Sequence, residues 1–166
     1  MFTLKPISPD SVDGALAKAE RYRLLNEPNE AESICRDILE VDPGNREARV
    51  SLVLALTDQM HEDRSVFSNT LSMASAFESE YDRAYYSGIA WERRAKALYR
   101  EATMGSARQV HDWLVRALDL FEKAEHLRPS GNDDAILRWN ACVRFLKRHK
   151  ELQPSRDEIP EPVISE

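Results

Sequence analysis

The residue types that perform most enzymatic chemistry are present in this chain, but no spacing groups them into a site. The four histidines are His61, His111, His126 and His149. His111 and His126 share one predicted helix, in which a rise of ~1.5 Å per residue separates them by about 22 Å. The chain contains no Cys-x-x-Cys, His-Glu-x-x-His, Gly-x-Ser-x-Gly or phosphate-loop motif. We therefore expect that the protein is not an enzyme and that it binds no cofactor and no metal.

The remaining titratable residues fit structural roles. Most carboxylates stand beside Arg or Lys at helical spacing, where they form solvated ion pairs. Cys35 and Cys142 each lie within an amphipathic pattern, and we interpret them as buried, reduced thiols rather than as a disulfide. An enzyme remains the alternative from another functional class, and a deep pocket with converging titratable groups would favour it.

Composition and charge exclude several classes of protein. The chain has 166 residues, a net charge of −6 and a pI near 5.3, whereas a nucleic-acid binder needs a concentrated cationic surface. No apolar run approaches the ~20 residues of a membrane-spanning helix. The first ten residues, MFTLKPISPD, lack the apolar core of a secretory signal. We expect a cytoplasmic protein that binds neither nucleic acid nor membrane.

Apolar residues recur with a period of about 3.6, which predicts an all-α protein. The first predicted helix covers residues 8–25, and the second begins at residue 28 and ends at the turn formed by 42–45. The third runs from that turn to residue 60, the fourth covers 64–79 and the fifth covers 81–103. The sixth begins at residue 106 and ends at the turn formed by 129–132, and the seventh covers 133–150. Residues 8–152 make up the helical domain, and residues 1–7 are an extended N-terminus. Residues 153–166 are rich in proline and acids, so we predict an extended or disordered tail.

Capping and turn residues support these boundaries. Ser8 can cap the first helix, and Asn26 can take the positive φ of the turn that follows it. Pro28 suits the first position of the second helix. Asn45 and Ser106 are predicted to cap the third and sixth helices.

The patterns within the last three helices predict how they pack. The helix over 81–103 has a seam of mostly small residues, made of Ala84, Gly88, Trp91, Ala95, Leu98 and Ala102, which lets a neighbouring helix approach closely. The next helix has an apolar face wide enough to contact more than one neighbour. The helix over 133–150 is predicted to bury Ile136, Trp139, Val143 and Leu146.

Two helix ends are alike, ILEVDPGN at 38–45 and AEHLRPSGN at 124–132. In each case a small residue (Ala31 or Ala117) comes before the helix end. A core residue (Cys35 or Phe121) stands four positions after the small one. This pattern resembles the tetratricopeptide repeat (TPR), a helix–turn–helix unit of ~34 residues. The first copy aligns over 12–45, the second over 46–80, and the third ends at Pro129. The resemblance implies an α-solenoid of about three TPR-like hairpins and a C-terminal capping helix, with a concave surface lined by the first helix of each pair.

The alignment and the helix faces give a set of candidate groove residues. They are Leu16, Glu20, Arg23, Val50, Leu54, Thr57, Tyr85, Ile89, Glu92, Lys96 and Tyr99, with Asn140 on the capping helix. They predict an apolar groove with a few charges, suited to a peptide or a helix of a partner protein. The alternative interpretation is that Leu16, Leu54 and Tyr85 pack the interior.

The resulting hypothesis is a protein–protein interaction module, acting as an adaptor, scaffold or assembly factor. The alternative is a self-associating structural protein, a homodimer through the fifth and sixth helices.

Two basic features of the sequence have two interpretations each. Arg93, Arg94, Lys96 and Arg100 either contact an acidic partner or form a solvated, paired face. The run RFLKRHK at 144–150 either complements the helix dipole or binds the acidic tail or an anionic partner.

Overall fold

The computed structural model describes residues 2–61, 63, 65–101 and 105–153. They form the α-helices α1 (Val12–Leu24), α2 (Pro28–Val41), α3 (Arg46–Gln59), α4 (Val66–Ser75), α5 (Glu80–Arg100), α6 (Ala107–Leu127) and α7 (Asp134–Arg148). Short 3-10 turns, η1 (Pro9–Ser11) and η2 (Lys150–Leu152), flank them. The described residues are 78% helical and contain no strand, which confirms the all-α class. The tail predicted at 153–166 lies outside the described residues, except for Gln153.

Most of the predicted turn chemistry is observed. Asn26 has a φ of 60°, and Pro28 opens α2. The Asn45 side chain accepts a hydrogen bond of 2.8 Å from the Ala48 amide, so it caps α3 as predicted. Ser79 caps α5 in the same way.

Two helix boundaries and one predicted cap differ from the prediction. The chain at Pro9 begins a 3-10 turn, so α1 starts only at Val12, and the Ser8 side chain makes no capping bond. Helix α4 ends at Ser75, four residues early, where Arg83 donates to the carbonyls of Phe77 and Glu78 and stabilises a turn. Ser106 precedes α6 without a side-chain capping bond.

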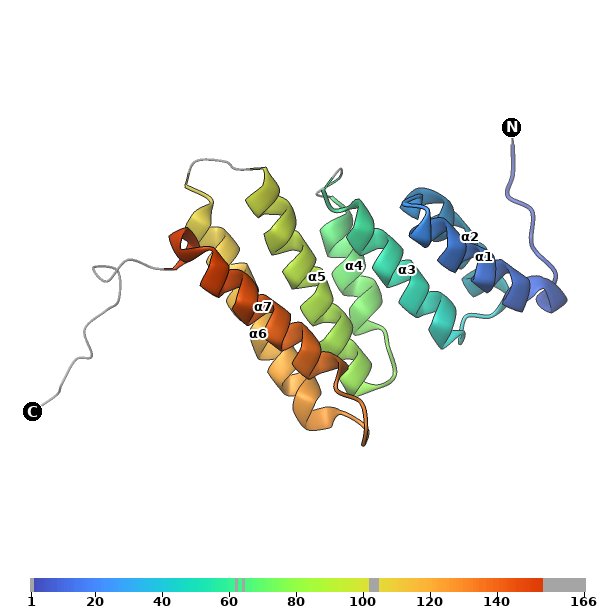
Figure 1. The fold of residues 1–166 in the computed structure, drawn as a ribbon. Helices are drawn as coiled ribbons and strands as arrows, with labels where there is room; N and C mark the ends of the chain where they lie inside the picture. The colour runs from blue at the N-terminus through green and yellow to red at the C-terminus, as the bar shows by residue number, and fades with distance from the viewer. Residues whose placement is uncertain (1, 62, 64, 102–104, 154–166) are drawn as a thin grey trace, which may run out of the picture.

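The helices pack side by side in chain order, each against the next (Figure 1). In addition, α1 contacts α3, α3 contacts α5, and α5 contacts α7. The odd-numbered helices therefore share one layer, and the even-numbered helices lie behind them in Figure 1. An ion pair joins two helix starts in the odd layer, because Arg46 binds both carboxylate oxygens of the buried Asp82 at 2.7 and 2.8 Å.

The predicted small-residue seam of α5 is the place where α6 comes closest. Ala84, Gly88 and Ala95 are buried, and the fully buried Phe121 ring of α6 lies over Gly88. A Cβ atom at position 88 would lie 2.7 Å from that ring, closer than atoms can pack. Trp91 is only partly buried, and Ala102 lies outside the described residues. A larger residue at position 88 would therefore force the Phe121 ring to shift.

The predicted core face of α7 is wrong in part, because Leu146 does pack against the main core cluster but the fully buried residues are others. Its buried residues are Ala135 and Cys142, whereas Trp139 is 37% exposed and Ile136 is only partly buried. The burial stripe is displaced because the face of α7 that meets α5 also carries a charged side chain, Arg138, which pairs with Glu92 of α5.

We predict that Gly88→Ala destabilises the fold although alanine is the better helix former. The overlap with Phe121 should cost about 1–3 kcal/mol or more, which exceeds the ~1 kcal/mol gained in helix propensity. Gly14→Ala is the matched control, because nothing lies within 4 Å of a Cβ there, and it should stabilise α1. Chemical denaturation measures both. If Gly88→Ala were as stable as Gly14→Ala, the crossing would not be as tight as described.

We also predict that neither cysteine reacts in the native protein. Burial raises the pKa of the Cys35 thiol to about 11 and that of Cys142 to about 12. Since the thiolate is the reactive form, a chromogenic disulfide reagent at pH 8 should label both thiols in concentrated guanidinium chloride and almost none in buffer. Because these pKa values are higher in the folded state, stability should fall as the pH rises above ~9. Rapid labelling of one thiol in buffer would show that its helices open.

Candidate functional site

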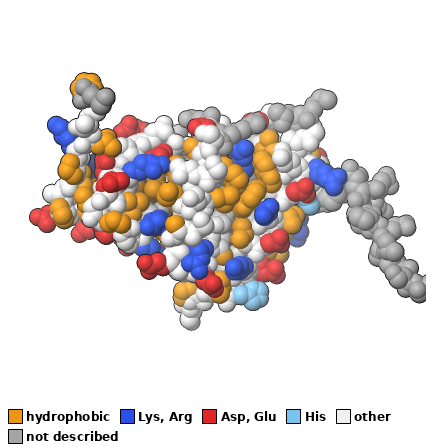
Figure 2. Space-filling view, turned by 180° about the vertical axis from the view of Figure 1, so that it is seen from behind, with side chains coloured by type: hydrophobic (Ala, Val, Ile, Leu, Met, Phe, Trp, Pro, Cys, Tyr) orange, Lys and Arg blue, Asp and Glu red, His pale blue; other side chains and the backbone are white. Residues whose placement is uncertain are grey.

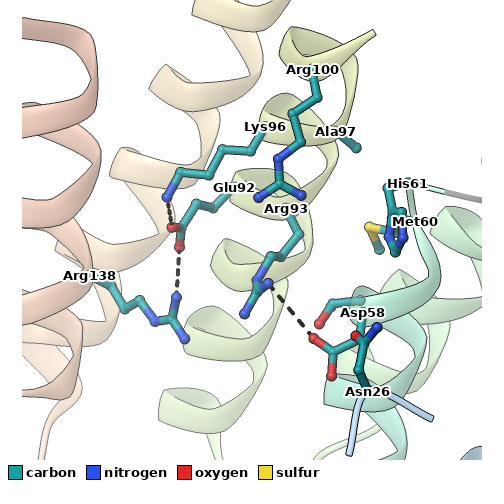
Figure 3. A pocket seen from close by; sticks show the side chains of 11 residues that line it. Asn26, Asp58, Met60, His61, Glu92, Arg93, Lys96, Ala97, Arg100 and Arg138 are labelled. Atoms are coloured by element: carbon teal, nitrogen blue, oxygen red, sulfur yellow. Dashed lines mark hydrogen bonds and ion pairs between the residues drawn. The ribbon is translucent and has the colours of Figure 1, made fainter. Parts of the chain in front are cut away.

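The odd-numbered layer contains a hollow of about 360 Å³ between α3, α5 and α7. Its lining is mostly charged (Figure 3). The lining residues are Asn26, Thr57, Asp58, Met60, His61, Glu92, Arg93, Lys96, Ala97, Arg100 and Arg138. We refer to this hollow, together with Arg23 beside it, as the cationic groove. It differs from the apolar groove that the sequence predicts.

One side of the groove is built on a single carboxylate, Glu92 of α5, which is 1% exposed. Lys96, one turn later on α5, donates to Glu92 Oε1 at 2.5 Å, and Arg138 of α7 donates to Oε2 at 3.4 Å (Figure 3). The Tyr85 hydroxyl is hydrogen-bonded to Arg138, and burial nevertheless raises the pKa of Tyr85. A buried carboxylate is tolerated only when it is paired, so Glu92 fixes both cations in place.

The other side is built on Asp58 of α3. Arg23 of α1 donates two hydrogen bonds to Asp58 Oδ2, of 3.0 and 2.9 Å, and Arg93 of α5 lies 3.7 Å from Oδ1. These contacts join three helices of the odd layer through one carboxylate. Figure 3 shows Arg93 directed towards Asp58 and Arg138 directed towards Glu92.

The groove has more positive than negative charge. Its cations are Arg23, Arg93, Lys96, Arg100 and Arg138, and its carboxylates are Asp58 and Glu92. Five cations against two carboxylates leave an excess of three positive charges. Within the part of the chain that the structure describes, Arg100 makes no hydrogen bond or ion pair. The arrangement can therefore accept further anionic groups.

The basic cluster predicted on the fifth helix is divided between two faces. Arg93, Lys96 and Arg100 line the groove, whereas the Arg94 guanidinium stacks over the rings of Phe67 and Trp113, at 5.4 and 5.3 Å from their centroids. Such stacking is a cation–π contact that stabilises the packing of α4, α5 and α6.

Some of the candidate groove residues lie in or beside the cationic groove. Thr57, Glu92 and Lys96 line it, and Arg23 flanks it. The Thr57 hydroxyl donates to the Leu54 carbonyl of its own helix, so this bond already uses its one proton.

The other candidates lie elsewhere. Ile89 is 1% exposed and belongs to the core, and Val50, Leu54 and Tyr85 pack against the same core cluster. Leu16, Glu20 and Asn140 do not line the groove.

Sequence reasoning missed Asn26, Asp58 and Arg138 as groove residues. One signal could have found Asp58. Arg23, Asp58 and Arg93 are spaced 35 residues apart, close to the length of one repeat. Charges of alternating sign at this spacing predict ion pairs between helices that lie side by side, which here are α1, α3 and α5. Arg138 lacks such a signal, because it lies 46 residues from Glu92.

Two further features lie outside the cationic groove. A more open hollow of about 540 Å³ lies between α4 and α6 on the face drawn in Figure 2, with Leu71, Trp91 and Leu120 in its lining. At the end of α5, the Tyr99 hydroxyl contacts His149 Nδ1 at 2.7 Å and donates to Glu151 Oε1 at 2.9 Å. The bond to Glu151 raises the pKa of Tyr99, which makes its hydroxyl a weaker acid and not an activated one.

No group of three or more His, Cys, Asp or Glu side chains in the described residues is arranged to hold a metal ion. None of the helices there is long and apolar enough to cross a bilayer. Both cysteines are free and buried. No known family model, curated protein or solved structure matches the chain.

We predict that Glu92→Ala destabilises the protein by about 2–3 kcal/mol, because it leaves Lys96 and Arg138 without their shared partner. The cost should be below the ~3–5 kcal/mol of a fully buried pair, since both cations reach water. Glu92→Gln keeps the shape and one acceptor and should cost less. Urea denaturation at low and high salt tests the order. Equal stability of Glu92→Ala and the native protein would show that the pair does not hold α7 to α5.

Proposed function

We propose that this chain is a TPR-like protein-interaction module that binds an acidic segment of a partner protein in the cationic groove. The observation that supports this most directly is the excess of three positive charges among the groove residues, with Arg100 unpaired in the described chain.

Several features support a TPR-like arrangement as the basis of the proposal. Helices follow one another in antiparallel order, and first helices contact first helices. Ala31 and Ala19, at the small positions of the first repeat, are both fully buried in one cluster. The 35-residue spacing of Arg23, Asp58 and Arg93 places equivalent positions of three hairpins in one row. In this arrangement α7 is the capping helix of an α-solenoid.

The chemistry of the groove favours a carboxylate-bearing peptide over an apolar helix. Arg93, Lys96 and Arg138 have side chains that are 36%, 25% and 31% exposed, so their charged ends remain accessible from the groove. Arginine can bind a carboxylate through two parallel hydrogen bonds, which favours acidic side chains or a terminal carboxylate. The apolar candidates Leu54, Tyr85 and Ile89 are instead used in the core. An apolar helix would leave the groove cations without partners.

An acidic peptide also fits the charge better than a nucleic acid does. The chain as a whole has a net charge of −6, so its remaining surface repels a long phosphate backbone. A short peptide contacts the groove alone. The homodimer through α5 and α6 has less support, because the facing apolar sides of these helices already pack on one another at Gly88 and Phe121.

The binding prediction uses a fluorescein-labelled hexaglutamate peptide, with hexalysine as the negative control. We expect hexaglutamate to bind at low salt, and we expect the affinity to fall as salt rises and screens the contacts. Arg93→Glu combined with Arg100→Glu should weaken binding by at least about tenfold, because both groups change from attraction to repulsion. Fluorescence anisotropy gives the dissociation constants.

A matched control variant separates the groove from general charge. Arg108→Glu combined with Lys123→Glu changes the net charge by the same amount at exposed positions of α6. It should bind hexaglutamate as the native protein does. Equal loss in both variants, or no binding by the native protein, would remove the groove as a binding site for acidic segments.

A further inference from the structure

The chain carries an acidic segment of its own directly after the helical domain. Residues 154–166 contain four acids, Asp157, Glu158, Glu161 and Glu166, and one base, Arg156. Their net charge is −3, which matches the excess of three positive charges in the cationic groove. The segment is also rich in proline, with three residues, so it resists helix formation and suits binding as an extended peptide.

The structure fixes the point from which this segment leaves the fold. Leu152 is 2% exposed and packs in the main core cluster. Glu151 accepts a hydrogen bond of 2.9 Å from the Tyr99 hydroxyl, and His149 contacts the same hydroxyl at 2.7 Å. Tyr99 is the neighbour of Arg100 in the last turn of α5. The segment therefore begins at the end of α5 that carries the unpaired groove cation.

The distances are short compared with the length of the segment. Along α5, a rise of ~1.5 Å per residue places Lys96 about 6 Å and Arg93 about 10 Å from Arg100. An extended chain spans about 3.3 Å per residue, so the four residues from Gln153 to Asp157 cover about 13 Å. Asp157 and Glu158 can reach the groove cations without any change in the helices.

We propose that residues 154–166 occupy the cationic groove of the free protein, with their carboxylates on Arg93, Lys96 and Arg100, and that an acidic segment of a partner displaces them. This inference rests on the proposed function, because both ligands use the same groove. A tethered segment acts at an effective concentration on the order of 1 mM. Even an intrinsic Kd of about 100 μM would then leave the groove about nine-tenths occupied and weaken partner binding by about tenfold.

The basic end of α7 is the competing place for the segment. Lys147 and Arg148 are exposed there and lie close in sequence to its start. They stand in the last turn, where cations already interact favourably with the helix dipole. The groove offers a hollow with cations converging from two helices, and the segment gains more charge-assisted hydrogen bonds there.

The experiment measures hexaglutamate binding to the full chain with and without the acids of the segment. In the tail variant, Asp157→Asn, Glu158→Gln, Glu161→Gln and Glu166→Gln remove four negative charges. The control variant removes the same number at exposed positions elsewhere, through Glu40→Gln, Glu47→Gln, Glu78→Gln and Glu122→Gln. We expect the tail variant to bind about tenfold more tightly than the native chain, and the control variant to stay close to the native Kd.

The outcomes separate this inference from the proposed function. If the native chain binds hexaglutamate in its groove and the tail variant binds equally well, the inference is overturned and the function stands. Equal tightening in the control variant overturns it too, because net charge then explains the effect. If Lys147→Glu combined with Arg148→Glu tightens binding as the tail variant does, the segment rests on α7 and the inference is wrong. If neither chain binds, the proposed function fails and the inference fails with it.

Discussion

The contact of Phe121 with Gly88 determines how the second half of the molecule is assembled. Helix α5 touches α3, α4, α6 and α7, and α6 comes against it where the glycine leaves space for an aromatic ring. Helix α7 packs on both α6 and α5, so its distance from α5 depends on this approach. At the observed distance, Arg138 of α7 donates a hydrogen bond of 3.4 Å to Glu92 Oε2 of α5. A close apolar crossing on one side of α5 thus places the charges on its other side.

Ion pairs join the helices of the odd-numbered layer, in addition to the apolar clusters that pack α1 against α3 and α3 against α5. Asp58 joins α1, α3 and α5, Glu92 joins α5 and α7, and Asp82 binds Arg46 at the helix starts. Each carboxylate is partly or fully buried and is shared by one or two cations, so its desolvation is offset by hydrogen bonds from several donors. Because the carboxylates are fewer than the cations around them, the pairs that stabilise the layer also leave positive charge at its surface. The side chains that pair within the layer are therefore also the ones that make the groove positively charged.

This arrangement explains why the groove is polar although the sequence predicts an apolar one. Val50 and Leu54 of α3 and Tyr85 of α5 are partly buried and pack against the main core cluster instead of lining the groove. The space between α3 and α7 in front of α5 is left to the longer charged side chains. An intramolecular acidic segment would protect such a surface from unselective contacts with other acidic chains, and it would make partner binding a competition.

Local features of the sequence were enough to predict the all-α class, the turn at Asn26, the start of α2 at Pro28 and the cap at Asn45, because each depends on a few neighbouring residues. The small seam of α5 was predictable for the same reason. The sequence did not predict the exposure of Trp139, the early end of α4, the partners of Asp58 or the pairing of Glu92 with Arg138. Those properties depend on which faces of distant helices meet. The pairs join residues 35 to 46 positions apart, and a charge is partnered or free only once the crossing of two helices brings a second side chain within hydrogen-bonding distance.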